Sequence, residues 1–195
     1  MKTFYSLLFF SLFFAACSSD PAEQPTTTPE TPLPYKLICL GSTLTVGDTL
    51  DPAQAYPQRL HEYFVAQGAE VKVVNAGIKG ETIKGAQERV RWLLQQRFAG
   101  MLLEVGNAES VQGQSADSLT VALRRLVQTV QEARPDVEIF VLDAVGWLPE
   151  SASLPAEVVR LALPSPINYR QIDAATEKTV ADAIGADLLR AITAK

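Results

Sequence analysis

Short apolar runs alternate with longer amphipathic stretches along most of this chain. Four runs are near-continuous in apolar residues, a pattern typical of parallel strands that are buried on both faces. These predicted strands cover residues 36–40, 71–74, 101–105 and 137–142. Apolar residues at helical spacing predict helices between and after them. The predicted helices cover about residues 57–68, 82–94, 115–135 and 167–185, and a short last strand is predicted at 186–192.

The order of these elements restricts the topology of the domain. Parallel strands that are joined through helices need right-handed crossovers, and the helices then cover both faces of the sheet. The sequence therefore predicts a flavodoxin-like three-layer α/β/α sandwich with a parallel sheet over residues 36–195, a length that fits one domain. In such folds the functional residues lie at the carboxyl ends of the strands.

The N-terminal segment differs in composition from the domain. Lys2 precedes a run rich in Leu and Phe that is too short to span a bilayer as a mature helix, and small residues then precede Cys17. This pattern resembles a bacterial lipoprotein signal, which implies removal of residues 1–16 and acylation of Cys17. A plain secretory signal that is cut nearby, or a thin membrane anchor, is the alternative. Ser18 implies, by resemblance to the enterobacterial sorting rule, placement in the outer membrane of the bacterial cell envelope.

Composition limits the possible partners. Residues 17–35 are rich in Pro and Thr with almost nothing to bury, which predicts a tether between the membrane and the domain. The formal net charge is -5 and Lys and Arg are scattered singly, so nucleic acid is not expected as a partner. Cys39 lies in an apolar run, and no disulfide is expected after maturation. No grouping has metal-ligand spacing and no Gly-rich phosphate loop follows the first strand, so neither a metal nor a cofactor is expected.

Polar motifs follow three of the predicted strands. Ser42 and Thr43 follow the first strand, residues 75–82 read Asn-Ala-Gly-Ile-Lys-Gly-Glu-Thr after the second, and residues 104–109 read Glu-Val-Gly-Asn-Ala-Glu after the third. In order and spacing these segments resemble the SGNH (GDSL) family of esterases and lipases, whose first motif reads Gly-Asp-Ser-Leu. The resemblance covers about residues 36–192, and it implies the SGNH hydrolase fold and hydrolysis of acyl esters.

The nucleophile position departs from the family pattern. The family's Ser is Thr43 in this chain, and the Asp before it is Ser42. The hydroxyl of Thr43 is on a β-branched carbon with one preferred rotamer, so it attacks only if that rotamer faces the acyl carbon. The alternative is that both hydroxyls bond the turn and the start of the following helix.

The resemblance also implies donors for the oxyanion. The backbone N–H groups of Thr43 and Gly80 match two of the family's donors. The third is an Asn side chain, and in an ungapped register its position is Ala108, with Glu109 at the motif's final Asp. Losing one such donor typically costs about a hundred- to a thousandfold in rate. A one-residue deletion in the loop would instead bring Asn107 into this role.

The base is the main absence. In the family an Asp-x-x-His segment near the C-terminus supplies the base and its orienter, but with a last strand at 186–192 this chain reaches Lys195 without one. Its single histidine, His61, is predicted to be a surface or boundary residue of the first helix. The missing segment should also leave an apolar face of the sheet uncovered, which predicts self-association or marginal stability.

Two features after the fourth predicted strand complete the picture. We expect Asp143 to be a hydrogen-bonding residue at the strand end rather than a catalytic acid. Residues 147–166 form a long connection, in a place where SGNH-like proteins shape the acyl pocket. The alternative is that this apolar loop only covers the sheet.

The sequence therefore predicts an SGNH hydrolase-like lipoprotein that is catalytically impaired, a pseudoenzyme with a binding or structural role at the cell surface. A shallow pocket for an acyl or acetylated-carbohydrate ligand is expected around Thr43, Gly80 and Asn107. One alternative is a weak esterase or lipase that acts through Thr43, or a hydrolase truncated by a change of reading frame. Another is an unrelated flavodoxin-like binding module.

Overall fold

The computed structural model describes residues 34–194. The predicted signal peptide, the lipidation site Cys17 and nearly all of the predicted tether lie outside the described residues. Among residues 34–194, no helix combines the length and the apolar character needed to cross a membrane.

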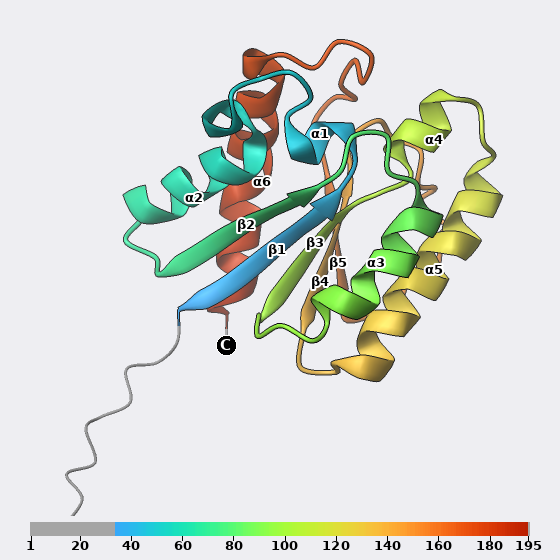
Figure 1. Ribbon diagram of the computed structural model, residues 1–195, viewed down its shortest axis with the longest axis horizontal. Helices are drawn as coiled ribbons and strands as arrows, with labels where there is room; N and C mark the ends of the chain where they lie inside the picture. The colour runs from blue at the N-terminus through green and yellow to red at the C-terminus, as the bar shows by residue number, and fades with distance from the viewer. Residues whose placement is uncertain (1–33, 195) are drawn as a thin grey trace, which may run out of the picture. The chain divides into compact units, whose positions relative to one another are not determined.

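A five-stranded parallel sheet forms the centre of the domain (Figure 1). Its strands lie in the order β2-β1-β3-β4-β5, and every neighbouring pair is parallel. The strand bounds are β1 Tyr35–Gly41, β2 Val71–Gly77, β3 Gly100–Glu104, β4 Glu138–Asp143 and β5 Val158–Ala162. The predicted α/β class with a parallel sheet is confirmed.

Helices cover both faces of this sheet. α2 and α6 pack on one face, and α3 and α5 pack on the other (Figure 1). Their bounds are α1 Thr43–Val46, η1 Pro52–Gln54, α2 Tyr56–Ala66, α3 Ile83–Leu93, α4 Asn107–Val111, α5 Ala116–Ala133 and α6 Ala174–Thr193, where η1 is a single 3₁₀ turn.

The alternation of side chains along each strand divides the core into two layers. In β1, Ile38 and Leu40 pack toward α3 and α5, whereas Leu37 and Cys39 pack toward α2 and α6. The central strand β3 is buried over its whole length, as its apolar run predicts. The prediction that residues 71–74 are buried on both faces is wrong, because β2 is an edge strand and most of its side chains are partly or fully exposed.

The C-terminal part of the fold differs most from the sequence prediction. Residues 186–192 belong to α6 and are not a strand. The last strand is β5, within the connection that was expected to be a loop. Asp173 begins α6, because its carboxylate accepts a hydrogen bond from the backbone N–H of Thr176 at 2.7 Å. Gly185 does not end a helix; it allows α6 to approach α2, since a Cβ there would lie 2.9 Å from Cδ1 of Tyr63.

The long helix α6 also corrects the prediction of an uncovered sheet face. Its apolar side is buried against the sheet and α2 through Val180, Ala181, Ile184 and Leu188. The expected self-association and marginal stability rested on that uncovered face. Because α6 covers it, the physical reason for both expectations is absent.

Candidate functional site

Two glycines bring the turn after β1 close to the sheet. Gly41 and Gly77 are register partners at the carboxyl ends of β1 and β2. A Cβ on Gly41 would collide with Thr45 and lie 2.8 Å from Cβ of Glu104, and a Cβ on Gly77 would collide with the backbone of Val46. The absence of both side chains lets the short helix α1 sit directly on the strand ends.

Thr43 and Gly80 are brought together by this arrangement. Thr43 is the first residue of α1 and is half-buried, and its Oγ1 accepts a hydrogen bond from the backbone N–H of Gly80 at 3.2 Å. Gly80 has a φ of 72°, a left-handed conformation that favours glycine. Two of the residues that the motifs predict for the site are therefore in contact.

Ser42 has a different position from Thr43. Its exposed fraction is 1%, and its backbone N–H donates to Oε2 of Glu104 at 2.9 Å. The side chain is therefore inside the domain rather than at the surface where a substrate would approach. Of the two adjacent hydroxyls, Thr43 is the accessible one.

Glu104, at the end of β3, is the centre of a buried polar cluster. Its carboxylate is fully buried and accepts five hydrogen bonds from four residues. The donors are the backbone N–H of Ser42 (2.9 Å), the backbone N–H and hydroxyl of Thr45 (3.2 and 2.9 Å), the Nδ2 of Asn107 (2.9 Å) and the hydroxyl of Tyr169 (2.9 Å). We call these five residues the Glu104 cluster.

Burial and hydrogen bonding act in opposite directions on the acid of this cluster. Burial raises the pKa of Glu104, and the hydrogen bonds from its neighbours only partly offset this effect. Because all five contacts donate toward the carboxylate, they hold α1, α4 and the segment after β5 against the end of β3. The geometry assigns Glu104 a structural role, because it binds Ser42 and Thr45 on either side of Thr43, and this role was not predicted from the sequence.

Asn107 is part of this cluster, and its amide is fully engaged. Its Nδ2 donates to Oε1 of Glu104 at 2.9 Å and to the carbonyl of Leu142 at 3.2 Å, while its Oδ1 accepts from the backbone N–H of Ala144 at 3.0 Å. The residue is completely buried. Both amide hydrogens therefore join β3 to β4, and neither remains for an oxyanion.

The neighbouring positions of the third motif also have structural contacts. The side chain of Ala108 packs against the core cluster on the α2 and α6 side. Oε1 of Glu109 accepts from the backbone N–H of Ile83 at 2.8 Å, which satisfies one donor at the start of α3. Burial raises the pKa of Glu109.

Asp143 lies at the carboxyl end of β4 and orders the loop that follows. Its two carboxylate oxygens accept from the backbone N–H groups of Trp147 (3.0 Å) and Leu148 (3.1 Å), and Arg160 on β5 forms an ion pair with it at 3.2 Å. The prediction of a hydrogen-bonding role at the strand end is confirmed. The ring of Trp147 packs on Gly106, where a Cβ would lie 2.5 Å from Cζ2.

The sequence predicts a helix from about residue 167, but residues 163–173 form an irregular segment between β5 and α6, so this start of the helix is wrong. Within it, the hydroxyl of Tyr169 reaches Glu104, and Ile167 donates its backbone N–H to the carbonyl of Ala144 at 2.9 Å. These contacts place the segment beside α1, because the backbone N–H of Leu44 also points to the Tyr169 hydroxyl at 3.5 Å.

An amide pair occupies this segment. Asn168 and Gln171 are exposed, and Nδ2 of Asn168 donates to Oε1 of Gln171 at 2.9 Å. Their spacing is that of Asp-x-x-His, and they lie after the last strand and before the last helix, the position that the resemblance gives to that motif. The expectation that the chain ends before such a segment is therefore wrong. The sequence contains a signal for this position, because Asn-x-x-Gln stands just before Asp173, the residue that caps the last helix.

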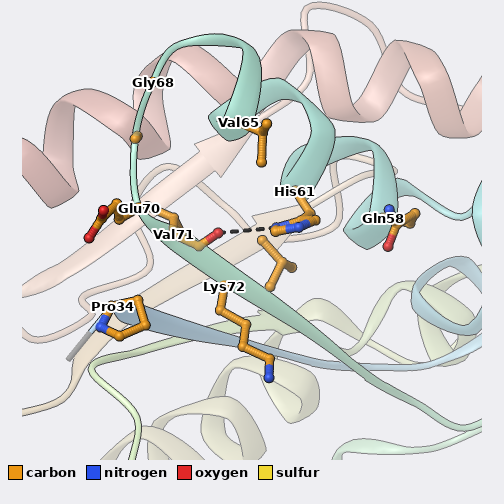
Figure 2. A pocket seen from close by; sticks show the side chains of 10 residues that line it. Pro34, Gln58, His61, Val65, Gly68, Glu70, Val71 and Lys72 are labelled. Atoms are coloured by element: carbon orange, nitrogen blue, oxygen red, sulfur yellow. Dashed lines mark hydrogen bonds between the residues drawn. The ribbon is translucent and has the colours of Figure 1, made fainter.

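His61 lies at the opposite end of the strands from Thr43. It is half-buried on α2, and its Nδ1 is 3.1 Å from the carbonyl oxygen of Val71 at the start of β2 (Figure 2). It lines an open cavity of about 670 Å³ beside the edge strand. The prediction of a boundary position is confirmed. Within residues 34–194, no group of three or more His, Cys, Asp or Glu could hold a metal ion.

The fold and the site define a class of protein. Comparison with family models gives no match. Among solved structures, the fold is similar to that of TesA (TM-score 0.65, 17% identity, 80% of this chain and 99% of that chain) and of AlinE4, an SGNH-hydrolase family esterase (TM-score 0.51, 20% identity, 56% and 58%). It is also similar to a two-domain esterase active on acetylated mannans (TM-score 0.64, 18% identity, 82% and 49%). The domain has the SGNH hydrolase fold.

Sequence comparison agrees with this class. The chain is 24% identical over 132 residues to an arylesterase of Vibrio mimicus, which covers 67% of this chain and 60% of the arylesterase. It is 27% identical over 101 residues to the esterase TesA of Pseudomonas aeruginosa, which covers 51% of this chain and 49% of TesA. The matches thus span less than two thirds of the relatives. The resemblance to SGNH/GDSL-type esterases is confirmed.

Proposed function

We propose that this domain is an SGNH esterase-like protein that has lost efficient ester hydrolysis and serves as a binding or structural protein at the cell envelope. The observation that carries this proposal is the amide pair Asn168–Gln171. Hydrolysis through Thr43 needs a group that removes its proton, and a second group that orients this base. The neutral amide of Gln171, at the position of the base, cannot take up that proton near neutral pH.

The oxyanion donors support the same proposal. The side chain of Asn107 is fully bonded within the Glu104 cluster, and the methyl group of Ala108 donates nothing. The N–H of Gly80 remains, although it donates to Thr43 in this structure. A site without a base and with one donor fewer keeps only a residual rate.

A weak esterase acting through Thr43 is the second candidate. The contact that favours it is the one between Thr43 Oγ1 and Gly80 N, because it places an accessible hydroxyl beside a backbone donor. Such an enzyme would use water or an unpositioned group as the base.

The ligand class that we propose is an acyl or acetylated-carbohydrate ester. One solved structure with this fold is an esterase active on acetylated mannans. Uncharged groups that suit a sugar are the hydroxyl of Thr43 and the amides of Asn168 and Gln171, on the segment whose Tyr169 hydroxyl lies 3.5 Å from the backbone N–H of Leu44. Titration calorimetry with O-acetylated and with deacetylated manno-oligosaccharides tests this class. Tighter binding of the acetylated form, weakened by Thr43→Ala, is expected; equal heats for both forms would contradict it.

We also propose that the mature protein is anchored through lipid on Cys17, in the outer membrane. The basic, apolar and small-residue order before Cys17 supports it. Metabolic labelling with a fatty-acid probe should mark the wild type but not Cys17→Ala. A wild type without label would reject the anchor.

Restoring the replaced groups tests where the chemistry was lost. We compare the wild type with Asn168→Asp/Gln171→His and with this pair plus Thr43→Ser, using p-nitrophenyl acetate. If the amide pair is the reason for impaired hydrolysis, the double variant hydrolyses the ester faster than the wild type. The triple variant then gains about a hundredfold or more in rate. A matched double variant, Asn168→Asp/Arg170→His, controls for added charge and imidazole. Equal rates for both double variants would contradict the assignment of residues 168 and 171.

A further inference from the structure

A cleft lies at the amino ends of the strands, whereas Thr43 lies at their carboxyl ends. Its volume is about 770 Å³. Residues from several parts of the chain line it, among them Pro34, Lys36, Lys72, Arg97, Arg134 and Asp136. The cations of this cleft are scattered in the sequence, and only the fold gathers them.

Three of these cations have no partner in the fold. Among residues 34–194, no ion pair or side-chain hydrogen bond involves Lys36, Lys72 or Arg97. Arg134 differs, because it holds Asp136 through two hydrogen bonds of 2.8 and 2.7 Å and also bonds the carbonyls of residues 96 and 98. The one acid that lines the cleft is thus neutralised by the one cation that is built into the fold.

The two lysines occupy positions at which their like charges repel each other. Lys36 on β1 and Lys72 on β2 are register partners, so their side chains project from the same face of neighbouring strands. Like charges at directly paired positions destabilise a sheet. No contact within the described domain offsets the repulsion between Lys36 and Lys72. This points to an anionic ligand outside the domain. Nearby, Glu138 is bound by the hydroxyl of Tyr35 at 2.7 Å.

We propose that this cleft docks on the headgroups of an anionic phospholipid surface. The chain enters the domain at Pro34, which lines the cleft and lies near Lys72 at the start of the sheet (Figure 2). The inference rests on the proposed lipid anchor at Cys17. Residues 18–34 span at most about 60 Å even when fully extended, so an anchored domain stays near the bilayer.

The net negative charge of the chain does not prevent this contact. At physiological ionic strength the field of an anionic membrane decays over about 8 Å. Acidic residues at the carboxyl ends of the strands are therefore screened from it, and of the acids at the end of the cleft, Asp136 and Glu138 are hydrogen-bonded within the fold, while Glu70 is exposed beside Lys72. The three unpaired cations lie at the end of the domain where the described chain begins at Pro34.

The test uses residues 18–195, which keep the whole described domain but carry no lipid. Cosedimentation compares vesicles of phosphatidylcholine with mixed vesicles of phosphatidylcholine and phosphatidylglycerol. We expect binding to the mixed vesicles alone, and weaker binding at higher salt. The triple variant Lys36→Gln/Lys72→Gln/Arg97→Gln should lower partitioning about 100-fold, since each cation near such a surface contributes roughly fivefold.

A matched triple variant separates the cleft from total charge. Lys84→Gln/Arg91→Gln/Arg125→Gln removes three exposed cations from α3 and α5 and should retain nearly wild-type binding. Thermal melts of both triple variants check that each is folded. Equal losses in the two variants, or equal binding to neutral and mixed vesicles, would overturn the proposal. So would saturable binding of free glycerol phosphate without vesicle binding. These measurements need neither lipid on Cys17 nor ester hydrolysis. Their outcome is therefore independent of the tests of the proposed function.

Discussion

The two halves of the candidate site use their polar side chains in different ways. In the Glu104 cluster, a buried carboxylate joins the ends of β1 and β3 to the segment before α6 through five hydrogen bonds. In the amide pair, Asn168 and Gln171 are exposed and bond each other. The buried half maintains the shape of the site, whereas the exposed half is free to change. The buried half can therefore keep its geometry when residues of the exposed half change.

The largest stability effect is expected in the buried half. Glu104→Gln keeps the shape of the side chain but replaces one acceptor oxygen with a donor, so at least two of the five donors lose their acceptor. We expect the free energy of unfolding to fall by about 3–5 kcal/mol. Urea denaturation measures it, with the exposed Glu88→Gln as the control. A loss below about 1 kcal/mol would show that the cluster does not hold the site together.

Glu177 extends the comparison to a second buried acid. Its Oε2 accepts from the backbone N–H of Tyr56 at 2.7 Å, and burial raises its pKa to about 8. The folded state therefore keeps a proton that the unfolded state releases near pH 4.5. Stability should fall as pH rises from about 4.5 to 8 and then level off, with a total loss of a few kcal/mol.

Glu177→Gln should remove most of this slope and raise stability at pH 8. Guanidinium unfolding at a series of pH values measures the effect, with the exposed Asp182→Asn as the matched control on the same helix. The raised pKa values of Glu104 and Glu109 leave a residual slope of the same sign. A profile that is unchanged by Glu177→Gln would contradict the assignment.

Gly185 tests the packing of the helix that closes the α2 side of the sheet. Gly185→Ala adds a Cβ at 2.9 Å from the ring of Tyr63, so we expect a loss of about 1–2 kcal/mol despite the better helix propensity of Ala. When Tyr63→Ala has removed the ring, the same Gly185→Ala change should become stabilising. Thermal melts of the wild type, the two single variants and the double variant form a double-mutant cycle. If the effects of the two substitutions on stability are additive, the contact between residues 185 and 63 is disproved.

The smallest effect is expected in the exposed half. Asn168→Ala removes two exposed hydrogen bonds, the one to Gln171 and the one that Oδ1 accepts from the backbone N–H of Arg170, so its cost should stay within about 0.5 kcal/mol. Its ester hydrolysis should equal that of the wild type. Chemical denaturation and a rate assay check both values. A large loss of either would mean that the amide pair has a role beyond its mutual contact.

Much of the fold follows from the sequence, because β1, β3 and β4 are apolar runs with few polar residues. The strand β5 was missed because it contains Arg160 and buries only Leu161. The end of α6 was mistaken for a strand because Gly185 suggests a helix stop, and its actual neighbour Tyr63 is distant in the sequence. Residues in contact across the fold determine that position, and no local pattern reveals them.

The candidate site was predictable to the extent that it is built from local motifs. Ser42, Thr43 and Gly80 follow from the segments after β1 and β2. The role of Glu104 depends on the register of β1 and β3, which pairs Gly41 with Glu104, and on Tyr169 from a distant loop. The sequence pattern does not reveal the amide pair, because it predicts the last strand after these residues, whereas β5 lies before them.

The most direct test of the proposed impairment of catalysis compares the wild type with Thr43→Ala. Hydrolysis of p-nitrophenyl acetate and butyrate is measured for residues 18–195 at neutral pH, with an uncatalysed blank. We expect the two proteins to have equal rates, because the proposal leaves Thr43 without a general base. A wild-type rate clearly above the blank that Thr43→Ala abolishes would make Thr43 a working nucleophile and contradict the proposal of impaired catalysis.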